Sequence, residues 1–261
     1  MILYANGCSH TAAAEAVVSD CFAEDDGRHG IDRRPHPKNL KASWCTHVAK
    51  ALNYTLICDA ESGSSNARII RTTTNWIDNN QSLWPQTLIM IQWTTWERQE
   101  WLHKDIWYQV NASGTDWLPN ELRLRYKKYI DTIDWTECTQ QAHLDAWNLH
   151  LYLKQKNIKH LFFSGHSTFS DIVISKKLNG NKKALETVYP TTRILPWGVN
   201  YMHPYEHDYS FHNWLVQNGG QYANPQSYHF DAKSHRLWAN YVLQYLYCNQ
   251  LVDCNSEVPT D

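Results

Sequence analysis

Apolar residues occur along this chain in two patterns, short uninterrupted runs and longer stretches with helical spacing. Such runs are typical of strands buried in a parallel sheet, and the chain has them at residues 1–5 and 87–93, while further short strands are expected at residues 54–58 and 159–163. Apolar positions three or four residues apart predict helices, which we expect at 43–52, 67–77, 121–133, 136–156, 210–218 and 232–246, with a further helix beginning over 12–18. Residues 106–110 are expected to form a short extra strand. Because strands and helices alternate, the pattern predicts an α/β protein, a three-layer α/β/α sandwich with a mainly parallel sheet.

Two polar stretches interrupt this alternation. Residues 19–41 are charged and poor in apolar side chains, which predicts a surface insertion near the carboxyl edge of the sheet. Residues 167–209 are expected to be rich in loops, and residues 167–199, which have no clear period, are expected to form an extended loop with a small strand. Neither stretch has the composition of a linker, so residues 1–261 are expected to fold as a single domain.

Charge and composition exclude several classes of partner. The formal net charge of −2 and the pI of about 6.7 give no reason to expect binding to nucleic acid or to an anionic membrane. No apolar run approaches the roughly 18 residues of a membrane helix, and no basic region precedes the first strand, so we expect no signal peptide. The seven cysteines form no CxxC pair, which favours reduced thiols in a cytoplasmic protein. The 13 tryptophans and 15 tyrosines suit both a core and a cleft that grips sugars.

The first candidate for chemistry is the turn after the first strand. Asn6-Gly7 ends that strand and Cys8-Ser9-His10-Thr11 follows, so Ser9 is expected at the carboxyl edge of the sheet, where open α/β sheets bind ligands. A serine beside free backbone N–H groups there is a candidate nucleophile with part of an oxyanion hole. The alternative is that Ser9 only caps the following helix.

Other polar groups follow the remaining strands. The second strand is followed by Gly63-Ser64-Ser65-Asn66, the third ends in Gln92-Trp93-Thr94-Thr95 and the fourth leads to His166. A last group, His229 to His235, comes directly before the final helix. A loop histidine in that position could act as the base that a serine nucleophile needs.

In these four blocks the sequence resembles the SGNH/GDSL hydrolase superfamily, in particular divergent members from bacteriophages. The resemblance implies the SGNH hydrolase fold, which is flavodoxin-like, with Ser9 as nucleophile in the place of the serine of the Gly-Asp-Ser turn. It further implies that the backbone of Gly63 binds the oxyanion and that His229 is the base, since His229 and His235 have the family's six-residue spacing.

Two of the family's catalytic positions are altered here. The family's third block carries an asparagine that completes the oxyanion hole, whereas this chain has Thr94 at the corresponding place. The hydroxyl of Thr94 or the amide of Asn66 could substitute, and the loss of one such donor typically costs about 10²–10³ in rate. The carboxylate that the family places three residues before the base is Gln226, which could orient an imidazole but not stabilise its charge.

Further residues near the strand ends are candidates for substrate binding. They are Trp93, Trp96, Arg98, His166 and His235. For His235 the simpler interpretation is packing at the start of a helix, and for Arg68 and Arg71 it is solvation on a helix surface. A competing motif, His203-Pro-Tyr-Glu-His207, matches the His-x-x-Glu-His pattern of zinc metalloproteases, but that chemistry requires both histidines on one face of a helix, and Pro204 argues against one.

The sequence therefore predicts a serine ester hydrolase acting on an ester, such as an O-acyl group on a carbohydrate. Ser9 would attack, His229 would accept its proton from within about 3.2 Å, and neither a metal nor an organic cofactor would be needed. The expected partner is a small-molecule or glycan ester, in the host cytoplasm or virion if the protein is phage-encoded. The alternative is a non-catalytic binding or virion-associated protein on the same fold.

Overall fold

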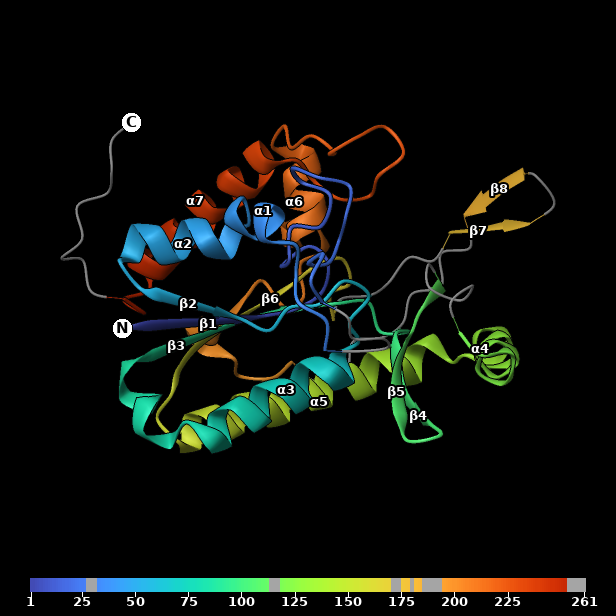
Figure 1. The fold of residues 1–261 in the computed structure, drawn as a ribbon, viewed down its shortest axis with the longest axis horizontal. Coiled ribbons are helices and arrows are strands. Elements are labelled where there is room, and N and C mark those ends of the chain that lie inside the picture. Colours follow the sequence, from blue (N-terminus) through green and yellow to red (C-terminus); the bar gives the residue numbers. More distant parts are fainter. Residues whose placement is uncertain (27–31, 113–117, 170–174, 179–180, 185–193, 253–261) are drawn as a thin grey trace.

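The fold is built on a central sheet of five parallel strands (Figure 1). The computed structural model describes residues 1–26, 32–112, 118–169, 175–178, 181–184 and 194–252. The strands are β1 (Ile2–Asn6), β2 (Thr55–Cys58), β3 (Thr87–Trp93), β6 (Lys159–Ser164) and β9 (Tyr201–Met202). Their order in the sheet is β2-β1-β3-β6-β9, which is the flavodoxin-like order, with β1 at the point where the direction of winding reverses.

Helices cover both faces of this sheet (Figure 1). On one face lie α1 (Pro37–Lys41), α2 (Trp44–Leu52), α6 (Phe211–Gln217) and α7 (Ala232–Cys248). On the other face lie α3 (Asn66–Asn79) and α5 (Trp135–Gln155). The predicted three-layer α/β/α sandwich is therefore confirmed.

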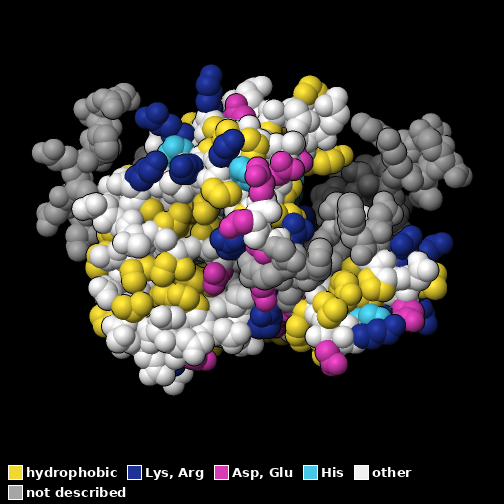
Figure 2. Space-filling view, viewed as in Figure 1, with side chains coloured by type: hydrophobic (Ala, Val, Ile, Leu, Met, Phe, Trp, Pro, Cys, Tyr) yellow, Lys and Arg dark blue, Asp and Glu magenta, His cyan; other side chains and the backbone are white. Residues whose placement is uncertain are grey.

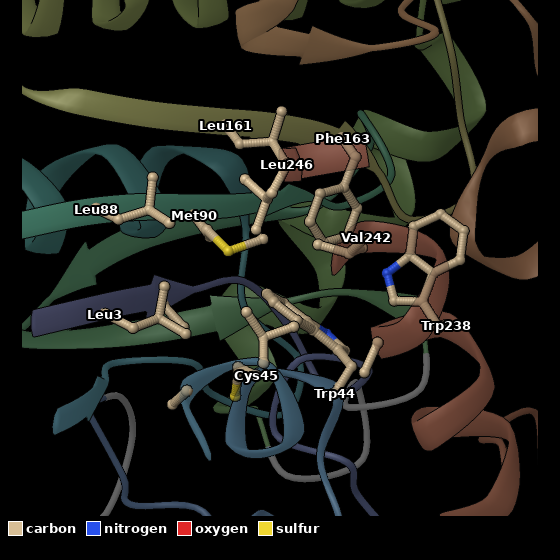
Figure 3. Close-up of a cluster of buried hydrophobic side chains, with 14 of the residues drawn as sticks. Leu3, Trp44, Cys45, Leu88, Met90, Leu161, Phe163, Trp238, Val242 and Leu246 are labelled. Carbon is tan, nitrogen blue, oxygen red and sulfur yellow. The ribbon is translucent and has the colours of Figure 1, made fainter. Parts of the chain in front are cut away.

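Alternate strand residues supply two separate hydrophobic cores, as the two-residue period of a strand requires. Leu3, Met90 and Phe163 point to the α2 and α7 side, where they pack against Trp44 and Trp238 (Figure 3). The strand residues that alternate with these point to the other face, where they pack on the α3 and α5 side. They include Tyr4, Ile89, Ile91 and Phe162. Because both faces of β3 are buried, all seven of its residues are buried, which explains its uninterrupted apolar sequence.

Local capping fixes the helix ends close to where the sequence predicts them. Ser43 begins α2 by accepting a hydrogen bond from the Thr46 N–H, and Asn53 ends the helix in the left-handed conformation, at φ 55°. Ser65 begins α3 in the same way, accepting from the Arg68 N–H. The fifth strand was missed because β9 has only two residues, paired with Phe162 and Phe163.

A small substructure lies beside the sandwich. Strand β4 (Gln99–His103), which was not predicted, pairs antiparallel with β5 (Ile106–Val110), and α4 (Asn120–Thr132) packs on the hairpin through Trp101, Leu122 and Tyr126. A second hairpin joins β7 (Ser175–Leu178) to β8 (Asn181–Ala184) within the predicted loop region. Short 3-10 helices span Gln81–Gln86, Gly198–Asn200 and His207–Tyr209.

Parts of the two predicted polar stretches, residues 27–31, 170–174, 179–180 and 185–193, lie outside the described residues. Within the described part of the chain, none of the helices is both long enough and apolar enough to cross a membrane.

The predicted helix over 12–18 does not form. Residues 8–18 instead make a series of turns, in which the Ala12 N–H donates to the Cys8 carbonyl and the Ala14 N–H to the Ser9 carbonyl. Ala13 and Glu15 take left-handed backbone conformations, at φ 53° and 63°, which a right-handed helix cannot accommodate. Ser9 is therefore not a helix cap, and the alternative interpretation of that residue is wrong.

Candidate active site

The turn after β1 is held at the carboxyl edge of the sheet by polar side chains. The Gly7 N–H donates to Asn6 Oδ1 at 2.8 Å, and Asn6 Nδ2 donates to the Thr72 hydroxyl of α3 at 2.7 Å. The Thr11 hydroxyl donates to Gln92 Oε1, at the end of β3, at 2.6 Å. A Cβ atom at Gly7 would lie 2.2 Å from Thr11 Oγ1, so only glycine fits where the turn passes beneath this side chain.

Ser9 lies in this turn with polar atoms that are free to react. Its side chain is nearly buried, at 5% exposed. Among the described residues, neither its hydroxyl nor its backbone N–H makes a hydrogen bond, although its carbonyl accepts from Ala14. An unpaired hydroxyl beside an unpaired N–H is the arrangement that an attacking serine with an oxyanion hole requires.

His229 lies beside the same turn and is held by a carboxylate from it. The centroid of its ring is 5.4 Å from that of His10, the residue after Ser9. Its Nδ1 lies 3.3 Å from Glu15 Oε2, which is ion-pair distance without the alignment of a good hydrogen bond. The Ser227 hydroxyl also donates to this carboxylate and accepts from the His229 N–H at 2.9 Å. The loop that carries His229 is thus tied to the turn that carries Ser9.

The charge of Glu15 is favoured in this setting. Burial raises the pKa of its carboxyl, but the hydrogen bond from Ser227 and the close approach of His229 outweigh that effect and hold the pKa below its ordinary value. Glu15 therefore supplies the charged partner that Gln226 cannot. The Gln226 side chain is exposed, and its backbone N–H donates to Asn224 at 3.0 Å.

The expected hydrogen bond between Ser9 and His229 is not formed among the described residues. The nitrogen of His229 that does not face Glu15 has no protein partner there, and neither does the Ser9 hydroxyl. Hydrogen bonds between catalytic groups are often long before substrate binds, so the pairing of these two residues stays a prediction.

The groups proposed for the oxyanion hole lie on the loops after β2 and β3. Gly63 is left-handed, at φ 85°, and its carbonyl accepts from Asn111 Nδ2 at 3.2 Å, while its N–H has no acceptor among the described residues. The Asn66 amide accepts from the Thr94 N–H at 3.0 Å and donates to the Thr94 carbonyl at 3.2 Å. This pairing engages Asn66 and leaves the Thr94 hydroxyl buried without a partner, so Thr94 is the better third donor of the two.

Two histidines pair beneath the site. His10 Nε2 and His166 Nε2 are 2.6 Å apart, so one nitrogen donates and the other accepts, and both rings are neutral. Burial lowers the pKa of His10 well below its ordinary value and that of His166 to about 3, and the neighbouring histidines and Arg98 act in the same direction. Arg98 has one buried guanidinium nitrogen without a hydrogen bond among the described residues, which keeps it a candidate for substrate binding.

Three of the predicted substrate-binding residues are buried in the structure. Trp93 is 1% exposed and packs edge-to-face on Phe162, and Trp96 is 5% exposed and stacks on Phe169 at 5.2 Å. His235 is 1% exposed, and its Nδ1 accepts from the Trp44 N–H at 3.4 Å. These side chains pack in the interior, and their role in substrate binding stays a prediction.

The arginines of α3 are also not simply solvated. Arg68 is buried, with Nε 2.5 Å from Glu61 Oε2 and a second ion pair to Asp32 at 3.1 Å. Arg71 pairs with Glu100 at 2.7 Å and with the same Asp32. Both cations are neutralised by carboxylates, which argues against their binding an anionic substrate.

The metalloprotease motif lacks the conformation that zinc binding requires. His203 is left-handed, at φ 48°, and its Nδ1 contacts Glu206 at 3.2 Å, while His207 begins a 3-10 helix, so the two histidines do not share a helix face. Within the described ranges, no cluster of three or more histidine, cysteine or acidic side chains has the geometry of a metal site.

No protein-family profile matches this chain, and neither does any curated protein. Among solved structures it is similar to a protein assigned as a GDSL-like lipase from Parabacteroides merdae ATCC 43184, with a TM-score of 0.42, 12% identity and 96% of each chain covered. It is also similar to a protein assigned to the G-D-S-L lipolytic family from Desulfitobacterium hafniense DCB-2, with a TM-score of 0.31, 11% identity and coverage of 94% of this chain and 98% of the other. Likeness at this level carries no conclusion about activity, and the bacteriophage-type resemblance stays a prediction.

Sequence reasoning missed Glu15. It lies six residues after Ser9 in a stretch whose alanines predict a helix. In such a helix the sequence does not show which way the Glu15 side chain would point. The available signal was that Glu15 is a carboxylate on the same segment as Ser9. A base that approaches Ser9 would therefore also come close to Glu15.

Proposed function

We propose that this protein is a serine ester hydrolase with Ser9, His229 and Glu15 as its reacting and supporting groups. The observation that carries the proposal is the contact of the His229 ring with both His10 and Glu15, since it brings base and carboxylate to the turn that holds Ser9. The same turn and the neighbouring loop also offer unpaired N–H groups at Ser9 and Gly63.

The reaction would follow acyl-transfer chemistry in two halves. Ser9 Oγ attacks the acyl carbon as His229 accepts its proton, and the N–H groups of Ser9 and Gly63, with the Thr94 hydroxyl, stabilise the oxyanion. His229 then returns the proton to the departing alcohol, which leaves an acyl-enzyme. Water, deprotonated by His229, attacks the acyl carbon, and His229 returns that proton to Ser9 Oγ as the bond to the serine breaks and the carboxylic acid leaves. Glu15 orients the imidazole through Nδ1 and stabilises its charged form.

We further propose a carbohydrate as the alcohol part of the ester. The buried Trp93 and Trp96 do not support this, but two tyrosines on the loop that carries the base could. Tyr222 is 42% exposed and Tyr228 is 79% exposed, and exposed aromatic rings suit the faces of sugars.

A fluorophosphonate probe tests the nucleophile directly. The wild-type protein is expected to be labelled at Ser9, as mapped by mass spectrometry of the digested adduct, and the Ser9→Ala variant is expected to stay unlabelled. Ser64→Ala is the matched control, because Ser64 is another buried serine on a neighbouring strand-end loop and its loss should leave labelling intact. A wild-type protein that resists the probe and does not hydrolyse short p-nitrophenyl esters would support the alternative, a binding protein on this fold. That alternative has its own support in the unformed Ser9–His229 hydrogen bond and in the altered Thr94 and Gln226 positions.

The role of Glu15 is tested by removing its charge and keeping its shape. We expect Glu15→Gln to lower kcat by up to about 10⁴ with little change in KM, because the charged imidazole forms only during the reaction. The measurement is the hydrolysis of a p-nitrophenyl ester as a function of pH, which separates a loss of positioning from a loss of folding.

The matched control for Glu15→Gln is Glu121→Gln. Glu121 also contacts a histidine, His103, at 3.1 Å, but on the hairpin substructure. Equal rates for wild type and Glu15→Gln at every pH would remove Glu15 from the mechanism while leaving Ser9 and His229 in place.

A further inference from the structure

A groove with an unusual charge lies between α1, α2 and the start of α7. It is open to solvent and has a volume of about 380 Å³, near the lower end of the range of about 300–1,000 Å³ typical of small-molecule sites. Its apolar floor consists of Val17, Ala42 and Ala232 and is only partly covered, since Val17 is 55% exposed. The rest of its lining is basic and consists of Lys38, Lys41, His47, Lys233 and Arg236.

None of the described residues that line this groove is acidic. Among the described residues, no ion pair involves any of its four lysine and arginine side chains, in contrast to Arg68 and Arg71 of α3. Asp231, the residue before Ala232, caps the start of α7. Its Oδ1 accepts hydrogen bonds from the N–H and the hydroxyl of Ser234, at 2.8 and 2.7 Å. Figure 2 shows Lys and Arg side chains gathered beside a histidine in the upper part of the face that these helices form.

The titration of His47 is consistent with a positive field in the groove. Burial lowers the pKa of its imidazole, and the charges of Lys50 and Arg236 lower it further. Four like charges that make no ion pair among the described residues repel one another, so an anion that binds among them relieves this repulsion as well as making its own contacts.

We propose that this groove binds a phosphate-bearing small molecule. A phosphate monoester carries nearly two negative charges at neutral pH and three acceptor oxygens, which suits several converging cations better than a single carboxylate does. Arg236 can contact two oxygens in parallel and the lysines act as point charges, while the apolar floor accommodates the non-phosphate part of the ligand.

Two residues that line the groove are close in sequence to residues of the candidate active site. Val17 lies two residues after Glu15, and Ala232 lies three residues after His229. The binding proposal is nevertheless independent of ester hydrolysis, since it needs neither Ser9 nor turnover.

Isothermal titration calorimetry tests the groove without a substrate. The probes are inorganic phosphate and a hexose 6-phosphate, with the unphosphorylated hexose as the neutral control. We expect the phosphorylated probes to bind the wild type, more weakly as salt rises, and the hexose not to bind. The Lys41→Gln/Arg236→Gln variant is expected to bind the phosphorylated probes at least tenfold more weakly.

The matched control is Lys127→Gln/Lys128→Gln on α4, which removes the same charge from exposed positions elsewhere. A second groove variant, Lys38→Gln/Lys233→Gln, keeps the test valid if the first fails to fold by circular dichroism. The proposal is overturned if the wild type binds neither phosphorylated probe, or if folded groove and control variants lose affinity equally, which would indicate a non-specific charge effect.

Discussion

The Ser9→Ala variant, the His229→Ala variant and the variant with both changes are expected to lose the same factor in kcat/KM for ester hydrolysis, about 10³–10⁶. The factor is shared because the two side chains perform one proton transfer, so removing the second costs little once the first is gone. Steady-state kinetics on a p-nitrophenyl ester measures all three variants against the wild type.

Strict additivity of the two losses would contradict this expectation, because it would mean that Ser9 and His229 act separately. The matched control is His166→Gln, which changes another histidine of the same cluster. His166 bonds to His10 and not to Glu15, so a loss as large as that of His229→Ala would move the base to the His10–His166 pair.

The second large effect is loss of stability in mild acid. Burial lowers the pKa of seven histidines. The pKa falls to about 4 for His143, His150 and His160 and to about 3 for His166 and His235, and it is also lowered for His10 and His47. Below a pH of about 6.5 the unfolded chain protonates these rings while the folded chain does not, so the free energy of unfolding is greatest above that pH and falls towards pH 4.

Three of these residues, His160, His166 and His235, together change the free energy of unfolding by about 4 kcal/mol per pH unit in the middle of this window. That slope is steep beside the total stability of about 5–15 kcal/mol of a typical domain. Glu61 and Asp145 have the opposite effect on the free energy of unfolding. Burial raises the pKa of each carboxyl, so the folded chain binds these protons first as pH falls, but these carboxyls are fewer than the histidines.

Urea unfolding followed by tryptophan fluorescence between pH 7.5 and 4.5 measures this slope. The His235→Asn variant is expected to reduce it by about one proton, and the exposed His207→Asn variant is the control for the substitution itself. A free energy of unfolding that stays constant across this range would show that the buried histidines are protonated in the folded protein as well.

Most of the fold could be predicted from the sequence because local and tertiary preferences agree there. The run Thr87–Trp93 is apolar because both its faces are covered, and Ser43 and Ser65 begin helices by side-chain capping, which is a local property. The chain over 8–18 is different, since its alanines favour a helix while contacts with Gln92, Asn39 and Ser227 hold it in turns. Tertiary contacts of this kind produce no periodic pattern of apolar and polar residues, so the sequence gives no signal of them.

The candidate site was predictable where it depends on strand ends. Ser9 and Gly63 follow β1 and β2, which are neighbours in the sheet, so their proximity follows from the strand order. The tryptophans could not be assigned in this way, because a side chain at the end of a strand can point into the core or out of it with the same sequence spacing. Trp93 points inward, where its ring fills the space beside Phe162.

The left-handed turn at Glu15 has a consequence for how the site is assembled. Residues 9–15 carry both the proposed nucleophile and the carboxylate, so only one other segment, the loop around His229, has to meet them. Opening that loop would separate the base from both partners at once and leave serine and carboxylate together. The proposed nucleophile, carboxylate and base thus come from two pieces of chain. At the interface between these pieces, where Ser227 and His229 contact Glu15, activity and loop stability depend on the same contacts.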